Sequence, residues 1–276
     1  MNDSLLMCYY ICMKSLIFTD LDGTFLNHHN YSYEESFEAL KKVKEAGIPL
    51  IFTTSKTKAE VEYLQEKVGI SEPFIVENGA ALFIPEGYQG FDLSFLSNYD
   101  DKRVMVFGES YTKVLEFYRL HKEEFSMVGL SDMSDAQIAH FTGLSQRDVI
   151  LAKQRDFTEP FILQDETKIK ALNKLAHRYG LKITQGGRFY HLMSESQDKG
   201  ISVIKTIELF ERLYQEKIRS IALGDSQNDI PMLERVDIPI LIQKHDGSYL
   251  ETDVHRIQKS NYQGSKGWNE MVLKNV

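Results

Sequence analysis

Two acidic motifs stand far apart in the sequence, and each follows a short apolar run. The first is Asp20–Thr24 (DLDGT), after Ser15–Thr19, and the second is Gly224–Asp229 (GDSQND), after Ser220–Leu223. If both runs are strands of one parallel sheet, the carboxylates meet at its carboxyl edge, where open α/β folds bind ligands. Several carboxylates in one place need a hard cation such as Mg²⁺ to be tolerable. Taken singly, the first motif also fits a turn, and the second fits the N-cap of a helix.

The elements that must position these motifs alternate between strand and helix. Ser15–Thr19 and Ile48–Thr54 are near-continuous apolar runs, which are typical of strands buried on both faces of a parallel sheet. Between them, Glu34–Ala46 has the spacing of an amphipathic helix, which Gly47 ends. The predicted inward residues of this helix are Phe37, Leu40 and Val43.

A second helix and a third strand extend this pattern. Thr57 and Glu60 have the spacing of a capping box, so we expect a helix that begins at Thr57 and ends at Gly69. Phe74–Val76 is predicted to be the next strand. The predicted inward residues of the helix are Val61, Leu64 and Val68.

The composition changes after Pro85. Glu86–Asp101 is rich in Gly, Asp, Ser and Asn, so we place a domain boundary there. Gly186 and Gly187 fit a tight hairpin turn, and Lys199 begins a long helix that leads back to the second acidic motif. The elements predicted beyond the boundary are the strands Arg103–Phe107 and Pro160–Leu163, helices near Thr112–His121, Asp135–Phe141, Gln146–Gln154 and Thr167–Tyr179, and a hairpin of Lys182–Gln185 and Arg188–Met193.

These patterns predict an α/β protein with a Rossmann-like parallel-sheet core and an inserted α+β cap domain. The core takes residues 13–85 and 194–276, the cap takes residues 86–193, and residues 1–12 form an N-terminal extension. The length of 276 residues fits two modest domains. Glu86–Asp101 and Met193–Asp198 would be the hinges on which the cap closes.

Charge and cysteine content exclude several classes of protein. The net charge is −8, and no Lys/Arg block is dense enough for a nucleic-acid partner. The apolar stretch Leu5–Met13 is too short to span a bilayer, and Asp3 precedes it, so we expect neither membrane insertion nor export. Cys8 and Cys12 suggest no disulfide framework, which fits a cytoplasmic protein, and Met13 is a plausible alternative start.

In this order, the two acidic motifs resemble the first and fourth motifs of the haloacid dehalogenase-like phosphatase superfamily. The resemblance implies that Asp20 attacks phosphorus to give an aspartyl-phosphate, while Asp22 serves as general acid and then general base. It further implies a bound Mg²⁺. The implied metal ligands are Asp20, the backbone carbonyl of Asp22, Asp225 and, as a further or outer ligand, Asp229.

The second and third motifs of that superfamily have counterparts here. Thr54, at the end of the second predicted strand, would donate a hydrogen bond to the transferring phosphoryl group. Lys199 would pair with Asp20 and a phosphoryl oxygen, where positive charge gains value in the transition state. A lone Thr or Lys is more often structural, but the order of all four motifs favours the catalytic interpretation.

The long insertion resembles the cap of the Cof-type subgroup and, within it, the mannosyl-3-phosphoglycerate phosphatases. The resemblance covers about Ser15 to Trp268. The segments that carry it are Thr54–Glu60, Glu77–Gly79, Arg155–Phe161, Gly186–His191 and Gly264–Trp268.

A sugar-phosphoglycerate substrate carries a carboxylate besides its phosphate, so the cap should supply cations. We favour Arg188 over His191 as an anion ligand, because strand alternation puts them on opposite faces and a structural role for His191 is equally plausible. Arg155 would bind an anion and Glu159 the sugar hydroxyls, the alternative being a local ion pair. The remaining candidate substrate-binding residues are Ser55, Lys56, which would bind the glycerate carboxylate, and Asn228.

The expected activity is hydrolysis of mannosyl-3-phosphoglycerate to mannosylglycerate and phosphate. Three alternatives remain open at this point. One is another sugar phosphatase of the same fold, for glucosyl-3-phosphoglycerate or sucrose phosphate or with broad specificity. The second is a phosphomannomutase, and the third is a phospho-ligand binding module without catalysis. The sequence does not fix the sugar epimer or the oligomeric state.

Overall fold

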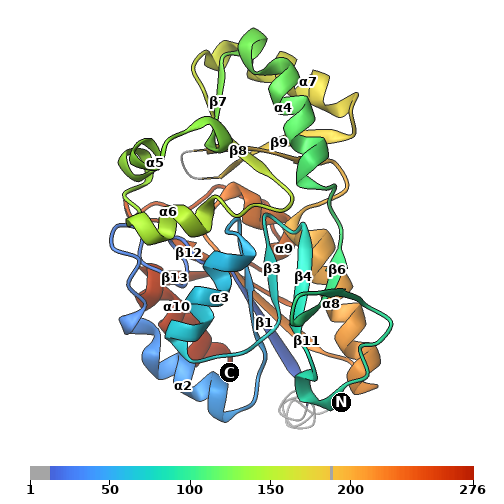
Figure 1. Ribbon diagram of the computed structural model, residues 1–276. Coiled ribbons are helices and arrows are strands. Elements are labelled where there is room, and N and C mark those ends of the chain that lie inside the picture. The colour runs from blue at the N-terminus through green and yellow to red at the C-terminus, as the bar shows by residue number, and fades with distance from the viewer. Residues whose placement is uncertain (1–12, 187–188) are drawn as a thin grey trace.

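The computed structural model describes residues 13–186 and 189–276, so the expectations for residues 1–12 lie outside the described residues. The chain forms two bodies, each built around a sheet of its own (Figure 1). The body in the lower half of Figure 1 holds both ends of the described chain, residues 13 and 276, and the upper body comes from the middle of the sequence. None of the helices in the described ranges is long and apolar enough to cross a membrane.

A nine-stranded sheet forms the lower body, which we call the core, in the order β13-β12-β11-β1-β2-β3-β4-β6-β5. Neighbours from β13 to β3 are parallel, whereas β4, β6 and β5 are antiparallel. The strands are β1 Ser15–Thr19, β2 Leu50–Thr53, β3 Phe74–Val76, β4 Ala81–Pro85, β5 Ser97–Tyr99, β6 Lys102–Val106, β11 Arg219–Gly224, β12 Ile238–Gln243 and β13 Gln258–Gln263. The predicted α/β class is confirmed.

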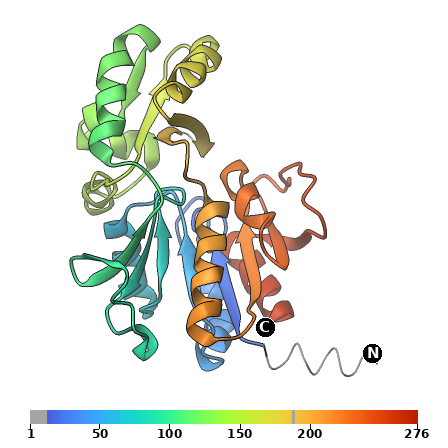
Figure 2. The ribbon, with the colours of Figure 1, turned by 90° about the vertical axis from the view of Figure 1, so that its right-hand side faces the viewer.

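Helices cover both faces of this sheet. Along β1, Ile17 packs toward one face, whereas Leu16 and Phe18 pack toward the other, as alternation requires. The first face holds α2 (Phe37–Glu45), α3 (Lys58–Val68) and α10 (Gly264–Asn275). The second holds α8 (Lys199–Tyr214) and α9 (Ile230–Leu233), and α8 lies in front of the strands in Figure 2.

The helices predicted for the core are present, but one residue that was predicted to face inward is exposed. Thr57 and Glu60 form the predicted capping box of α3, and Gly69 ends that helix in the left-handed conformation. Phe37, however, is exposed, because it stands at the first position of α2 and packs edge-on against Tyr33 at the surface.

The predicted domain boundary after Pro85 is wrong. Lys102–Val106, which the sequence placed in the cap, is β6, and it pairs with β4 in the core sheet. The polar segment Glu86–Asp101 therefore connects two core strands and carries β5 along the sheet edge, so it is not a hinge. The chain crosses between the bodies near residues 107–110 and 194–198.

The upper body, which we call the cap, has an antiparallel sheet in the order β7-β8-β10-β9. One face packs against α4 and α7, and the other against α5 and α6. The elements are β7 Met127–Gly129, β8 Glu159–Leu163, β9 Leu181–Gly186, β10 Phe189–Ser194, α4 Tyr111–Phe125, α5 Asp135–Thr142, α6 Gln146–Ala152 and α7 Ile169–His177.

Candidate active site

The carboxyl edge of the core sheet brings the two acidic motifs together. Asp20 follows β1, Asp225 follows β11, and these two strands are parallel neighbours. Gly23, with φ of 83°, allows the close approach, because a Cβ there would lie 2.6 Å from a carboxylate oxygen of Asp225. The two motifs therefore meet at one edge of the sheet, as the sequence predicted.

A buried lysine joins this acidic edge. Lys199 begins α8, and its Nζ lies 2.6 Å from Oδ1 of Asp20 and 2.6 Å from Oδ1 of Asp229. All three side chains are buried. A single ammonium therefore compensates two carboxylates that would otherwise repel each other.

Asp20, Asp225 and Asp229 each offer an oxygen, and these three oxygens lie within 4.8 Å of one another. Burial raises the pKa of Asp20 to about 7, and burial, with Asp229 and Asp20 nearby, raises the pKa of Asp225 well above its usual range. Oxygen ligands and unrelieved negative charge suit a hard divalent cation. The other oxygen of Asp229 accepts hydrogen bonds from the backbone amides of Asp225 and Ser226, so Asp229 also organises the loop.

The carboxylate of Asp22 is not part of this group of three carboxylates. Its Oδ2 lies 2.8 Å from Nζ of Lys56, and Nζ of Lys56 lies 3.7 Å from Glu60. The ring of Tyr31 lies 5.5 Å from the same ammonium. Asp22 thus faces the cleft with a cation beside it, and metal binding by its backbone carbonyl stays a prediction.

A cleft of about 450 Å³ lies between these loops and the cap. The cap contacts the core beside it: the Thr57 hydroxyl donates to the carbonyl of Leu151 at 2.9 Å, and the Tyr31 hydroxyl donates to the carbonyl of Thr142 at 3.4 Å. Residues of the cap therefore form one wall of the cleft. Of the candidates, those that line it are Asp20, Asp22, Ser55, Lys56, Arg155, His191, Asp225 and Asn228.

His191 lines the cleft together with Phe189, on the same face of β10. Its ring Nδ1 is buried without a hydrogen-bond partner among the described residues. Burial, with Arg155 and Lys199 nearby, lowers the pKa of His191 to about 3, so the ring is neutral. A role of His191 in substrate binding stays a prediction. Arg188 lies outside the described residues.

Of the predicted pair Arg155 and Glu159, only Arg155 lines the cleft. Glu159 is buried inside the cap, where it accepts hydrogen bonds from the Ser131 amide at 2.9 Å and the Tyr111 hydroxyl. It shares a face of β8 with Phe161, which packs in the cluster of α4 and α7. Glu159 therefore faces away from the cleft, and its predicted contact with sugar hydroxyls is wrong. Arg155 lines the cleft but is held in an ion pair with Glu77.

Thr54 is buried just beyond β2, and its hydroxyl accepts a hydrogen bond from the Lys56 amide at 3.2 Å. It does not line the cleft, so its contact with a phosphoryl group stays a prediction. Asn228 does line the cleft, and its Nδ2 donates to Oδ1 of Asn78 at 2.9 Å.

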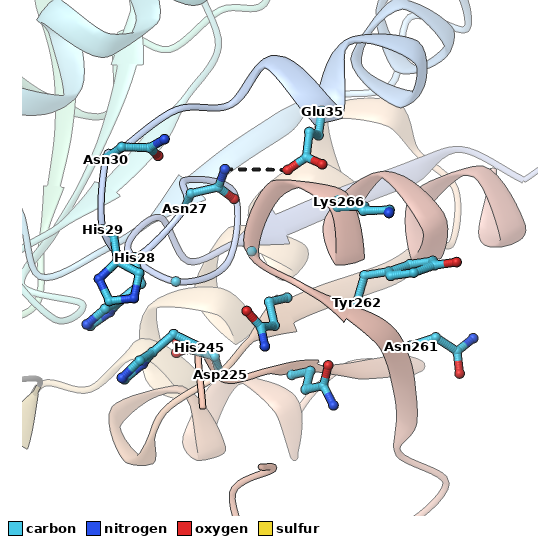
Figure 3. Close-up of a pocket in the computed structure, with 14 residues that line it drawn as sticks. Asn27, His28, His29, Asn30, Glu35, Asp225, His245, Asn261, Tyr262 and Lys266 are labelled. Carbon is cyan, nitrogen blue, oxygen red and sulfur yellow. Dashed lines mark hydrogen bonds between the residues drawn. The ribbon is translucent and has the colours of Figure 1, made fainter. Parts of the chain in front are cut away.

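An adjoining hollow of about 430 Å³ was not predicted from the sequence. It shares Asp225, His28 and His29 with the cleft, and Figure 3 shows both histidines beside His245 at one end. The rings of His28 and His245 are stacked with their centroids 4.0 Å apart. The pair His28-His29, which begins four residues after the end of the first motif, was the one sequence signal that could have indicated this feature.

The fold and this site define the class of protein. Residues 17–252 match the haloacid dehalogenase-like hydrolase family, and the chain belongs to that family. A glucosyl-3-phosphoglycerate/mannosyl-3-phosphoglycerate phosphatase of Persephonella marina is 48% identical over 259 residues, covering 94% of this chain and 96% of that protein. A protein of the same description from Methanococcoides burtonii is 41% identical, covering 95% and 97%.

Solved structures share the fold at lower identity. A Thermoplasma acidophilum protein has a TM-score of 0.69 at 18% identity, covering 95% of this chain and 98% of the other. A phosphatase of the haloalkanoate superfamily from Bacteroides thetaiotaomicron has a TM-score of 0.66 at 20% identity, covering 95% and 94%. The family match confirms the predicted resemblance to the superfamily, and these solved structures confirm the fold.

Proposed function

We propose that this protein is a magnesium-dependent phosphatase that hydrolyses mannosyl-3-phosphoglycerate to mannosylglycerate and phosphate. The observation that carries the proposal is the buried contact of Lys199 with Asp20, at the sheet edge that Asp225 shares. The descriptions of the two relatives, which match nearly the whole chain, support the substrate class.

In the proposed reaction, a carboxylate oxygen of Asp20 forms a bond to phosphorus while the bond from phosphorus to the ester oxygen breaks. Asp22 gives its proton to that leaving oxygen. In the second step Asp22 takes a proton from water, the water oxygen bonds to phosphorus, and the carboxylate of Asp20 is released. Lys199 holds Asp20 in place and offsets the negative charge around the attacked phosphorus.

The three carboxylates fit a divalent cation, because their oxygens converge and burial raises the pKa of two of them. Asp20 and Asp225 would hold it, with Asp229 as a further ligand. When bound, Mg²⁺ screens the repulsion between an anionic nucleophile and an anionic phosphate.

The cleft supplies groups for the rest of the substrate. Lys56 would bind the glycerate carboxylate, because its ammonium lies in the cleft beside Asp22. His191 would contact a sugar or glycerate oxygen, because its side chain lines the cleft and its Nδ1 has no hydrogen-bond partner among the described residues. Ser55 and Asn228 line the same space.

The test is phosphate release, with Mg²⁺ and with a chelator, from mannosyl-3-phosphoglycerate, glucosyl-3-phosphoglycerate, mannose 6-phosphate and 3-phosphoglycerate. Metal-dependent preference for the mannosyl compound supports the proposal. Equal turnover of both sugar-phosphoglycerates supports a dual activity, like the one that the relatives' names state. An isomerised sugar phosphate without free phosphate points to a mutase, and binding without turnover points to a non-catalytic module.

Asp20→Asn tests the nucleophile in the same assay. Its side chain is nearly isosteric, so the variant should fold and lose turnover. Full activity of this variant contradicts the proposed aspartyl-phosphate.

A further inference from the structure

The turn Glu77–Gly79 between β3 and β4 has an unusual backbone. All three residues have positive φ, at 49°, 60° and 87°. Such conformations cost free energy for Glu77 and Asn78, and they persist only where the surroundings enforce them. The turn is therefore held by its contacts, which come from four separate segments.

The first of these segments belongs to the cap. The carboxylate of Glu77 is completely buried and lies 3.2 Å from Nε of Arg155. It is surrounded by donors of one short stretch that follows α6. These donors are the backbone amides of Asp156 at 2.8 Å, Phe157 at 3.3 Å and Thr158 at 2.8 Å, and the Thr158 hydroxyl at 2.8 Å.

The second segment is the loop Thr54–Lys56, which carries the expected phosphoryl-binding residue. Nη2 of Arg155 donates to the Ser55 carbonyl at 2.8 Å. The amides of Glu77 and Asn78 donate to the carbonyls at either end of the loop, Lys56 at 3.0 Å and Thr54 at 2.9 Å. The loop is thus held on one side by a core residue and on the other by a cap residue.

The remaining segments are the second crossing between the bodies and the loop of the fourth motif. Nε2 of Gln197 donates to the Glu77 carbonyl at 2.9 Å. Gly79 packs so closely that a Cβ there would lie 2.2 Å from the carbonyl oxygen of Asp198, next to Lys199. Asn78 accepts the hydrogen bond from Asn228 described above.

We propose that Glu77 and Arg155 are positioning residues that fix the loop Thr54–Lys56 relative to the cap, so that seating of the cap sets the geometry of phosphoryl binding. The proposal rests on the proposed function, since it takes this loop to bind the transferring group. Neither residue touches the reacting atoms. Arg155 acts through the Ser55 carbonyl, and Glu77 acts by fixing the guanidinium.

Charge and shape both matter in this arrangement. A Gln at position 77 presents an NH₂ group to a set of hydrogen-bond donors, so at least one pair of donors would face each other. A Lys at position 155 keeps the positive charge but has no planar fork with which to bind Glu77 and Ser55 at once. Both substitutions should loosen the loop without removing any residue of the proposed chemistry.

The variants to compare are Glu77→Gln and Arg155→Lys. Glu86→Gln and Arg103→Lys are matched controls, because Arg103 and Glu86 form an Arg–Glu pair, 2.8 Å apart, within the core alone. Steady-state kinetics would be measured with mannosyl-3-phosphoglycerate and with p-nitrophenyl phosphate, which carries no glycerate. All measurements are made with Mg²⁺ and well below the melting temperature of each variant.

A loss of kcat of about 10- to 100-fold on both substrates, with little change in KM for the aryl phosphate, is the expected result, because small misplacement of a reacting geometry has effects of this size. Unchanged kcat in variants of lowered melting temperature would overturn the proposal, since the pair would then serve stability alone. A raised KM for the glycerate compound alone would overturn it too, because Arg155 would then be a substrate ligand. If Glu77→Gln does not fold, Arg155→Lys decides the question.

Hydrogen exchange provides a readout that does not depend on activity. We expect the amides of residues 54–57 to exchange about tenfold faster or more in Glu77→Gln than in Glu86→Gln. Unchanged exchange would overturn the proposal even if hydrolysis is found. If the wild-type protein hydrolyses no phosphate ester, the proposed function fails. The exchange result still tests whether Glu77 and Arg155 hold the loop Thr54–Lys56.

Discussion

The ammonium of Lys56 lies 2.8 Å from Oδ2 of Asp22, so the proposed acid and base of the reaction is in direct contact with a cation of the neighbouring loop. The contact joins the first motif to the segment that follows the second. It also puts a positive charge where the carboxylate of a glycerate could reach it.

Lys56→Met should lower kcat/KM for mannosyl-3-phosphoglycerate at least about tenfold, because the glycerate carboxylate loses its cation, and a tenfold change corresponds to about 1.4 kcal/mol. Lys58→Met is the matched control, since Lys58 pairs with Glu62 and Asp100 and does not line the cleft. Steady-state kinetics of both variants test this. An equal loss in the two would contradict the role given to Lys56.

In the presence of a chelator, so without bound metal, Lys199→Met should lower the free energy of unfolding by about 3–5 kcal/mol. The substitution leaves the carboxylates of Asp20 and Asp229 buried without the ammonium that they share. Added Mg²⁺ should restore part of this loss by neutralising the same carboxylates. Lys205→Met is the control: its ammonium pairs with Glu208 on the exposed side of the same helix, so at most about 1 kcal/mol is expected. Urea unfolding with and without Mg²⁺ measures the differences.

Binding of Mg²⁺ should weaken as the pH falls below about 7. Burial raises the pKa of Asp20 to about 7, so at lower pH the metal must displace a proton, and binding releases that proton. Without metal, the folded protein keeps the proton of Asp20 up to about pH 7, whereas the unfolded chain loses it near pH 3.8. The contribution of protonated Asp20 to the free energy of unfolding is therefore lost as the pH rises from 3.8 toward 7. Titration calorimetry in buffers of different ionisation enthalpy should detect proton release in the wild type and less of it in Asp20→Asn. Equal release in both would contradict the assignment.

His191 should make the folded protein sensitive to acid. Its pKa is lowered from 6.5 to about 3 in the folded state, so between these values the unfolded chain binds a proton that the folded chain does not. The free energy of unfolding should therefore decrease as the pH falls through this window, by about 1.4 kcal/mol per pH unit from this group. Denaturant titrations from pH 7 to 4 should give a smaller decrease for His191→Asn than for the wild type. Parallel curves would contradict the prediction.

The sequence was sufficient where a signal is local and repeated. The apolar runs before Asp20 and Asp225 predicted two parallel strands and hence their shared edge, and the structure has both. Such runs cannot be assigned to one sheet or another, however, which is why β6 was placed in the cap. The pairing of β6 with β4 makes it a core strand. The amino-acid composition of a strand does not reveal which strand it pairs with.

The side chains around the cleft show the same limit. Arg155 and Glu159 are four residues apart and both looked suitable for substrate, but Glu77, far away in the sequence, binds the first, and Ser131 and Tyr111 surround the second. The packing of cap against core decides the first partner, and the packing within the cap decides the others. Glu77 belongs to a segment that carries the family resemblance, but the sequence does not indicate Arg155 as its partner.

The position of α10 has a consequence for biosynthesis. Nε1 of Trp268 donates to the hydroxyl of Thr19 at 3.1 Å, so the strand that precedes the proposed nucleophile is completed by a helix residue 249 positions later in the sequence. The cap sheet, by contrast, has all of its strands once Ser194 has been synthesised. A nascent chain can therefore finish its cap while β1 still lacks both β11 and Trp268.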